Sequence, residues 1–184
     1  MHYDIGIYHQ VAKNIDTRLA LYYTDITNYI VFDSPRSYYS DYYAYNLGSV
    51  NFYGVEWEFS STLFNKLGLL GNYTYRGMNR EETELPVVFW LDLPPKHKFN
   101  IGLRYRLLKD SLLTCDLRYV GKRKSGNFTN DDFFITDVGI EQTIFKKLKV
   151  LLYINNLFGE NYEEVHGFPM PGQTYGVQVK LALF

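Results

Sequence analysis

The sequence lacks an apolar run long enough to cross a membrane as a helix. Its longest apolar stretch, LPVVFWL at 85–91, falls far short of the ~20 residues that such a helix needs. Helical spacing of apolar residues is also absent throughout the chain. A transmembrane helix is therefore excluded. A β-barrel wall is compatible with the mean hydropathy of −0.24, because alternating strands average to near-neutral values.

Charge of one sign and cysteine are also scarce. Nineteen basic residues balance 20 acidic ones, so no broad basic field favours a nucleic-acid partner. The single cysteine, Cys115, cannot form an intrachain disulfide and lies in a strand-like run, where we expect an inert packed thiol. No signal-peptide pattern precedes the strand-like run at 1–11, so we expect either a protein that is not exported or a chain that lacks its own beginning.

Aromatic residues, in contrast, are abundant. They make up 18% of the chain, with 18 tyrosines and 13 phenylalanines against three methionines. Tyrosine has an apolar ring and a polar tip, so it suits surfaces that are half apolar and half wet, including membrane interfaces.

Apolar and polar residues alternate along most of the chain. In HKFNIGLRYRL, at 97–107, one face carries Phe99 and Ile101, whereas the other carries Lys98 and Arg104. The run at 112–121 repeats the pattern, and the intervening Lys-Asp predicts a tight hairpin. The same pattern predicts an all-β protein of about nine strands, at 3–11, 17–32, 44–62, 67–78, 97–108, 111–124, 132–145, 148–158 and 173–184.

The connections between these strands alternate in length. Short connections are expected at 12–16, 64–66, 109–110 and 146–147, and long ones at 33–43, 79–96, 125–131 and 159–172. This alternation is typical of an antiparallel transmembrane β-barrel with short periplasmic turns and long extracellular loops. An odd strand count places the C-terminus in the periplasm and the N-terminus outside. Complete single-chain barrels have even counts, so a missing N-terminal piece is expected.

The two faces of the predicted strands differ in character. One is apolar and aromatic, as at Tyr53, Trp57 and Phe99, and the other carries charges, as at Glu58 and Arg104. A soluble barrel or sandwich that buries the apolar face inside is one arrangement that fits. Tyrosines near the strand ends favour the inverted arrangement with an apolar outer face, and so do mixed-sign charges that would pair across a wet lumen.

The closing segment carries a more specific signal. YINNLFGENYEE at 153–164 and HGFPMPGQTYGVQV at 166–179, followed by a terminal Phe184, resemble the C-terminal signature of TonB-dependent outer-membrane receptors. That family typically ends with Asn-Leu-Phe, then Asn-Tyr, a Pro-Gly-Arg turn and a last strand ending in Phe. The segment at 167–175 resembles the cobalamin and siderophore receptor branch.

Three upstream runs resemble barrel strands of the same family, in the same order. They are LYYTDITNYIVF at 21–32, NFYGVEWEFS at 51–60 and PPKHKFNIGLRY at 94–105. Two features depart from the family pattern. Gln173 stands where the turn usually has Arg, and the apolar alternation of the last strand, which ends on Leu183, is out of phase with Phe184.

The resemblance implies that residues 1–184 are the C-terminal part of a barrel of about 22 strands, without signal peptide, TonB box, plug or early strands. It implies TonB-dependent uptake of a metal chelate (ferric siderophore or haem) or cobalamin across the bacterial outer membrane, with no enzymatic activity and no cofactor. The implied partners are outer-membrane lipid, the ligand, the receptor's own plug domain, TonB and the barrel assembly machinery, for which Phe184 would be the signal. Alone, the chain is not expected to transport, and its two bare sheet edges predict aggregation or closure only as a strained, narrow barrel.

Two predicted loops are candidates for ligand contact. At 32–46, clustered Tyr offers rigid contact area and Arg offers a fork for carboxylate or phosphate; an aromatic girdle on a solvated loop stem is the alternative. At 78–95, a Phe-Trp pair would touch ligand or pack on a neighbouring loop. The candidate residues are Arg36, Tyr38, Tyr39, Tyr42, Tyr43, Phe89 and Trp90.

The sequence shows no pattern of a metal centre or a catalytic site. The four histidines, His2, His9, His97 and His166, lack metal-ligand spacing. The carboxylate pairs at 131–132 and 163–164 are interpreted as solvated loop charge, with a weak Ca²⁺ site as the alternative. Glu56 and Glu58 share the charged face, where pairing with lumenal Arg is expected, because no cleft or second motif supports a glycosidase pair.

Two other functions fit the same strand pattern. One is a small complete barrel of about eight to ten strands with a structural or adhesive role, which an upstream plug-encoding sequence would exclude. The other is an outer-membrane barrel hydrolase, either a protease or a lipase. That enzyme would need a His near a carboxylate or Ser at the loop end.

Overall fold

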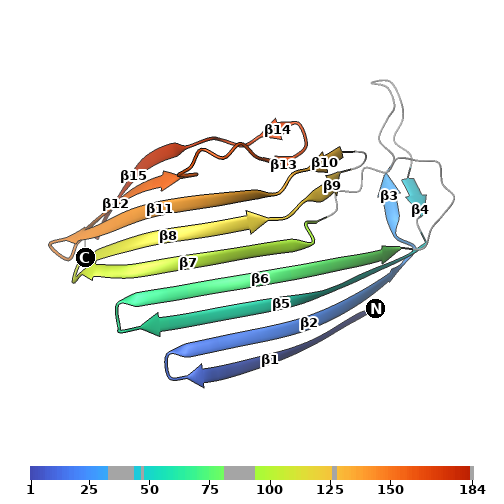
Figure 1. Cartoon of the computed structure of the whole chain (residues 1–184), viewed down its shortest axis with the longest axis horizontal. Coiled ribbons are helices and arrows are strands. Elements are labelled where there is room, and N and C mark those ends of the chain that lie inside the picture. Colours follow the sequence, from blue (N-terminus) through green and yellow to red (C-terminus); the bar gives the residue numbers. More distant parts are fainter. Residues whose placement is uncertain (33–43, 47, 81–93, 126–127, 183–184) are drawn as a thin grey trace.

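The computed structural model describes residues 1–32, 44–46, 48–80, 94–125 and 128–182. Most of these residues form one antiparallel sheet of nine strands, in the order β1-β2-β5-β6-β7-β8-β11-β12-β15 (Figure 1). The long strands therefore lie side by side in chain order, each paired with the next. The described part of the chain contains no helix, and so none that could span a membrane.

The sheet is built from long strands, and three short strand pairs lie beyond it. The long strands are β1 (His2–Ala12), β2 (Ile15–Thr27), β5 (Ser49–Leu63), β6 (Leu67–Arg80), β7 (His97–Leu108), β8 (Ser111–Val120), β11 (Phe133–Ile144), β12 (Leu148–Asn155) and β15 (Thr174–Leu181). The short pairs are β3 (Ile30–Phe32) with β4 (Ala44–Asn46), β9 (Arg123–Ser125) with β10 (Phe128–Asn130), and β13 (Glu163–Val165) with β14 (Phe168–Pro169).

The two ends of the sheet differ as the sequence predicts. Tight turns at 13–14, 64–66, 109–110 and 145–147 join strands at one end, here called the turn end. All three short strand pairs lie at the opposite end, here called the loop end (Figure 1). Both β1 and β15 run from the loop end to the turn end. The prediction of an antiparallel nine-stranded wall with unequal ends is confirmed.

Three predicted strands are interrupted in the structure. The runs expected at 17–32, 44–62 and 111–124 are each interrupted before the loop end. Asn28 and Gly48 have φ of 58° and 75°, which breaks the extended path, and residues 121–122 separate β8 from β9. Beyond each break the described chain leaves the nine-stranded sheet, and its short strand pairs with the other short strand of the same loop.

The register gives the sheet an apolar and a polar face. Leu19 pairs with Trp57, which pairs with Tyr73, whereas Arg18 pairs with Glu58. On the apolar face, Ile7 is 65% exposed and Val177 is 66% exposed. The buried hydrophobic residues of the described chain are Val50, Val120, Phe133 and Ile135, and the register places all four on the polar face. No second layer of described residues covers the apolar face, as expected of a barrel wall rather than a soluble sandwich.

Tyrosine rings lie across directly opposed glycines. Tyr22 on β2 pairs with Gly54 on β5, and a Cβ on Gly54 would clash with the Tyr22 hydroxyl and with the backbone carbonyl of Tyr75. Arg76 Nε on β6 donates a hydrogen bond to Tyr22 Oη at 3.1 Å, so the ring links three strands. Covering a strand glycine with a cross-strand ring offsets the packing that the glycine cannot supply. The same arrangement recurs at Tyr53–Gly77 and Tyr153–Gly176.

We expect Gly54→Ala to lower the free energy of unfolding by about 1–3 kcal/mol, because a backbone carbonyl and a bonded ring must both move. Gly6→Ala is the matched control, since the nearest atom to its Cβ would be the Leu19 carbonyl oxygen at 3.6 Å, an ordinary contact. Urea midpoints of the protein purified in detergent from its native host, read by the shift in gel mobility on heating, compare the two substitutions. Equal midpoints would show that the Tyr22 ring leaves its place without cost.

Candidate ligand-binding surface at the loop end

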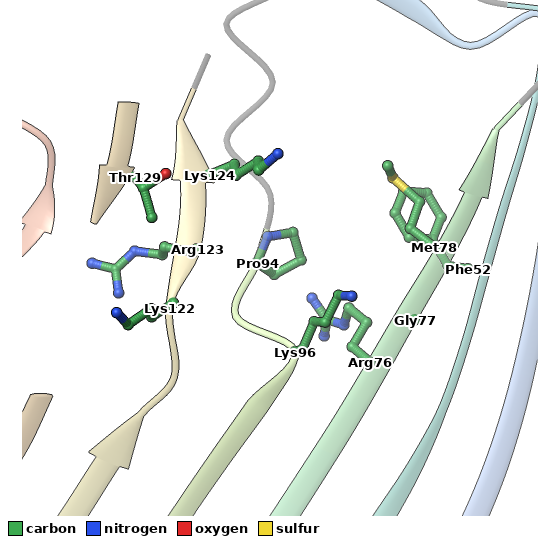
Figure 2. A pocket seen from close by; sticks show the side chains of 10 residues that line it. All are labelled: Phe52, Arg76, Gly77, Met78, Pro94, Lys96, Lys122, Arg123, Lys124 and Thr129. Carbon is green, nitrogen blue, oxygen red and sulfur yellow. The ribbon is translucent and has the colours of Figure 1, made fainter. Parts of the chain in front are cut away.

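A cavity of about 460 Å³ opens on the polar face at the loop end (Figure 2). Half of its described lining is basic, and no acidic residue belongs to that lining. The basic residues are Arg76, Lys96, Lys122, Arg123 and Lys124. A cluster of cations with no acid among them attracts anionic groups.

Two of these cations, Lys122 and Arg123, already contact other residues of the protein. Lys122 Nζ lies 3.3 Å from Asp131 Oδ1, and this exposed ion pair links Lys122 to the segment between β10 and β11. Arg123 donates from Nη2 to the Glu163 carbonyl at 2.7 Å and from Nε to the Glu164 carbonyl at 3.2 Å. Arg123 therefore ties β9 to β13, and Lys122 neutralises a loop carboxylate.

Arg76, Lys96 and Lys124 are the cations available for a ligand. None of the three forms an ion pair with a carboxylate of the described residues. The N–H of Arg76 donates to the Lys96 carbonyl at 2.9 Å, so these two residues lie on adjoining backbone, and Figure 2 shows Lys124 on the strand across the cavity. Their side chains combine an Arg fork with two mobile ammonium groups.

Apolar side chains complete the cavity. Phe52 and Met78 come from β5 and β6, and Pro94 precedes β7 (Figure 2). An aromatic face, a thioether and a proline ring give contact area without charge, and the thioether adapts to irregular shapes. The cavity thus suits a ligand that carries both negative charge and flat apolar groups.

Arg118 of β8 fixes the loop at 159–172, between β12 and β15, to the polar face. Its Nη1 lies 3.1 Å from Glu164 Oε1, and its Nη2 donates to Tyr162 Oη at 3.3 Å. The guanidinium carbon lies 5.7 Å from the centre of the Phe133 ring, which is 4.5 Å from that of Tyr162. Phe133 belongs to a buried cluster with Val120 and Ile135, and Tyr162 packs against that cluster, so the loop before β13 is held over the polar face.

Asn156 closes the same loop at its base. It is 3% exposed and has a φ of 52°, a left-handed conformation that Asn tolerates better than most residues. Its side-chain amide donates to the Glu160 carbonyl and accepts from the Glu160 N–H, both at 2.8 Å. Its own backbone N–H donates to Asp137 Oδ1 at 2.7 Å. The Asn of the Asn-Leu-Phe motif is therefore the structural base of the outer loop.

The predicted contact residues are not placed by the structure. Arg36, Tyr38, Tyr39, Tyr42, Tyr43, Phe89 and Trp90, together with Phe184, lie outside the described residues, and their roles stay predictions. Sequence reasoning missed the cavity cations. Two signals could have found all of them except Arg76, namely Lys-Arg-Lys at 122–124 and PPKHK at 94–98, because each lies where a strand meets a long loop.

Several of the carboxylates and histidines singled out in the sequence have ordinary partners. Glu58 lies 3.9 Å from Arg18, which matches the expected pairing on the polar face. Asp131 pairs with Lys122, and Glu163 Oε2 accepts the Gly167 N–H at 2.9 Å. His97 Nδ1 is 2.8 Å from Tyr73 Oη. Within the described ranges, no group of three or more His, Cys, Asp or Glu residues could hold a metal ion.

Comparison with known proteins identifies the protein family to which this sheet belongs. Residues 1–157 match the family model described as TonB-dependent receptor-like, β-barrel. No curated protein matches the chain.

Solved structures share the fold over 98% of this chain. The ferric-catecholate import receptor Fiu of E. coli K12 has 19% identity and a TM-score of 0.74, with 27% of Fiu covered. The copper transporter OprC has 17% identity and a TM-score of 0.81, with 30% covered. The FrpB iron transporter of Neisseria meningitidis has 17% identity and a TM-score of 0.76, with 30% covered. The chain therefore spans less than a third of each of these proteins.

We expect Asn156→Ala to release the base of the outer loop, because it removes both side-chain bonds to Glu160 and leaves Ala in a left-handed conformation. The free energy of unfolding should fall by about 2–3 kcal/mol. Asn156→Gly separates the two causes, since Gly keeps the backbone conformation and loses only the bonds. Limited proteolysis at 159–172 and urea midpoints provide the readout. Cleavage rates of both variants equal to that of the wild type would contradict this role.

Proposed function

Because the chain belongs to the TonB-dependent receptor β-barrel family, we propose that it forms part of the ligand-facing wall of a receptor for an anionic metal chelate. Membership rests on the family model, which matches residues 1–157 of the 184. The observation that carries the ligand class is the loop-end cavity, whose described lining has five cations, three of them without an ion pair to a described carboxylate, and no acidic residue.

The family sets the location and the general role. Its members are outer-membrane receptors and transporters of Gram-negative bacteria, not enzymes. The predicted location is confirmed, as is the expected lack of enzymatic activity, and the hydrolase alternative is excluded. The turn end is the periplasmic end of the wall and the loop end is the extracellular one.

Charge favours a ferric siderophore or haem over cobalamin as the ligand. Catecholate and carboxylate groups give iron chelates negative charge, which Arg76, Lys96 and Lys124 complement. Flat catechol or porphyrin rings also match the Phe52, Met78 and Pro94 side of the cavity. Two of the similar structures are named as iron receptors or transporters, which supports this choice.

Residues 1–184 are proposed to be the C-terminal part of a larger barrel with a plug domain, driven by TonB and inserted by the barrel assembly machinery. In the described sheet, β1 and β15 each pair on one side only, so each presents an edge that a further strand could pair with. DNA upstream of the Met1 codon should encode an in-frame plug. Detergent refolding of the 184-residue chain into a heat-modifiable, protease-resistant monomer would contradict this proposal and favour a small complete barrel.

We expect the double substitution Lys96→Gln and Lys124→Gln to weaken binding of a ferric catecholate by at least about tenfold in the receptor that contains this chain, because two charge-assisted contacts are lost. Lys109→Gln together with Lys180→Gln, an equal loss of two charges at the turn end, is the control and should leave affinity unchanged. Fluorescence quenching measures binding, and uptake of radioactive iron measures transport. Affinity that survives even when Arg76→Gln is added would overturn the assignment of this cavity.

A further inference from the structure

Two of the four tight turns share an unusual design. Residues 63–67 read Leu-Phe-Asn-Lys-Leu and residues 144–148 read Ile-Phe-Lys-Lys-Leu. Phe64 and Phe145 have φ of 52° and 51°, and the next residue of each turn is also left-handed, at 55° and 60°. In both, the N–H three residues after the last strand residue donates to its carbonyl, at 3.0 Å and 3.2 Å. Positive φ at both central positions is the pattern of a type I′ turn.

Phenylalanine is a poor residue for this position. Type I′ turns favour Asn, Asp or Gly, and a bulky side chain with positive φ is strained. Packing within the chain does not compensate, because Phe64 is 91% exposed and Phe145 is 93% exposed, the highest values among the exposed large hydrophobic residues described. Neither backbone preference nor internal contact explains why two separate turns place Phe at the same point.

Lysines surround these tips. Every one of the four turns carries at least one, and they are Lys13, Lys66, Lys109, Lys146 and Lys147. Asp110 is the only acid within the turns at 13–14, 64–66, 109–110 and 145–147. All five lysines are exposed, and none forms an ion pair with a described carboxylate.

The apolar face of the wall continues down to these turns. Leu107 and Leu108, just before the β7–β8 turn, are 50% and 66% exposed, and Leu181 at the end of β15 is 60% exposed. The turn tips therefore lie where the lipid-facing surface stops. At the loop end, in contrast, the chain continues beyond the nine-stranded sheet into the three short strand pairs (Figure 1).

We propose that the turn end is a binding surface for anionic phospholipid headgroups of the periplasmic leaflet. Phe64 and Phe145 insert at the boundary between acyl chains and headgroups, where an exposed aromatic ring gains apolar contact. The five lysines contact phosphate groups, to which surface cations are attracted at short range. The proposal rests on the outer-membrane location of the family and does not depend on the chelate.

Native mass spectrometry tests this surface. The receptor that contains this chain, extracted from outer membranes in mild detergent, is titrated with phosphatidylglycerol or with phosphatidylcholine, and the retained lipids are counted. We expect phosphatidylglycerol to bind with at least about a tenfold lower Kd, and added salt to reduce the difference. Lys66→Gln, Lys146→Gln and Lys147→Gln together should remove the preference. Lys96→Gln with Lys124→Gln, a charge loss at the opposite end, should preserve it.

Phe64→Asn with Phe145→Asn separates a lipid contact from a structural one. Asn suits a type I′ turn better than Phe, so the urea midpoint in detergent should stay the same or rise. Retention of both lipids should nevertheless fall, which a purely structural Phe would not cause.

Three results would overturn the proposal. The first is equal retention of the two lipids by the wild type, which would leave the surface to a protein partner. The second is a preference that is lost with the loop-end lysines instead of the turn lysines. The third is full lipid retention by the Asn variant.

Discussion

The continuous register of nine antiparallel strands is the constraint on which the other features depend. Successive side chains on a strand alternate between faces, so a slip of one residue would move a whole strand's charges into lipid. Between long strands, the register shifts only between Gln10 and Ala12 and between Arg106 and Leu108, both next to a turn. Both irregular pairings thus lie at the turn end, where few residues of the strand remain whose side chains could be placed on the wrong face.

The same register explains why the polar face can hold its loops. Phe133 and Phe134 are adjacent in sequence, yet one is 4% exposed and the other 41% exposed, because they lie on opposite faces. Phe133 pairs with Val120 and lies beside Arg118 on the neighbouring strand, which creates a binding place for Tyr162. A loop that is long in sequence is thereby held at one point of the wall, and the cavity beside it keeps a defined lining.

Alternation predicted nine long strands and their two faces, because the apolar set recurs every second residue without exception in runs such as 97–107. The alternating lengths of the connections predicted the antiparallel arrangement. It could not predict which loop residues meet. The contact of Arg118 with Glu164 joins residues 46 apart, and that pairing depends on the path of a loop that has no periodic signal. The breaks at Asn28 and Gly48 were missed for a related reason, since one left-handed residue ends a strand without changing the apolar pattern around it.

Gln173 departs from the Pro-Gly-Arg pattern of the family, and its hydrogen bonds show what the amide does at this position. Gln173 Nε2 donates to the Leu157 carbonyl at 2.6 Å, and its Oε1 accepts from the Tyr175 hydroxyl. An amide both donates and accepts, whereas a guanidinium only donates, so Arg at this position could not accept from Tyr175. Gln173 therefore links the loop base to the last strand through one donated and one accepted hydrogen bond.

A net charge of −1 conceals how cations are distributed along the wall. Mid-wall, Arg104 and Asp116 pair at 2.7 Å on the polar face, so charge is neutralised locally there. At the loop end, Arg76 is held by Tyr22, and a fixed cation in a cavity can discriminate between ligands by geometry. At the turn end, lysines stand on exposed tips, and none of them pairs with a carboxylate in the described part of the chain. A fluid lipid surface has no fixed geometry to match, so mobile ammonium groups suit it better than a rigid fork would.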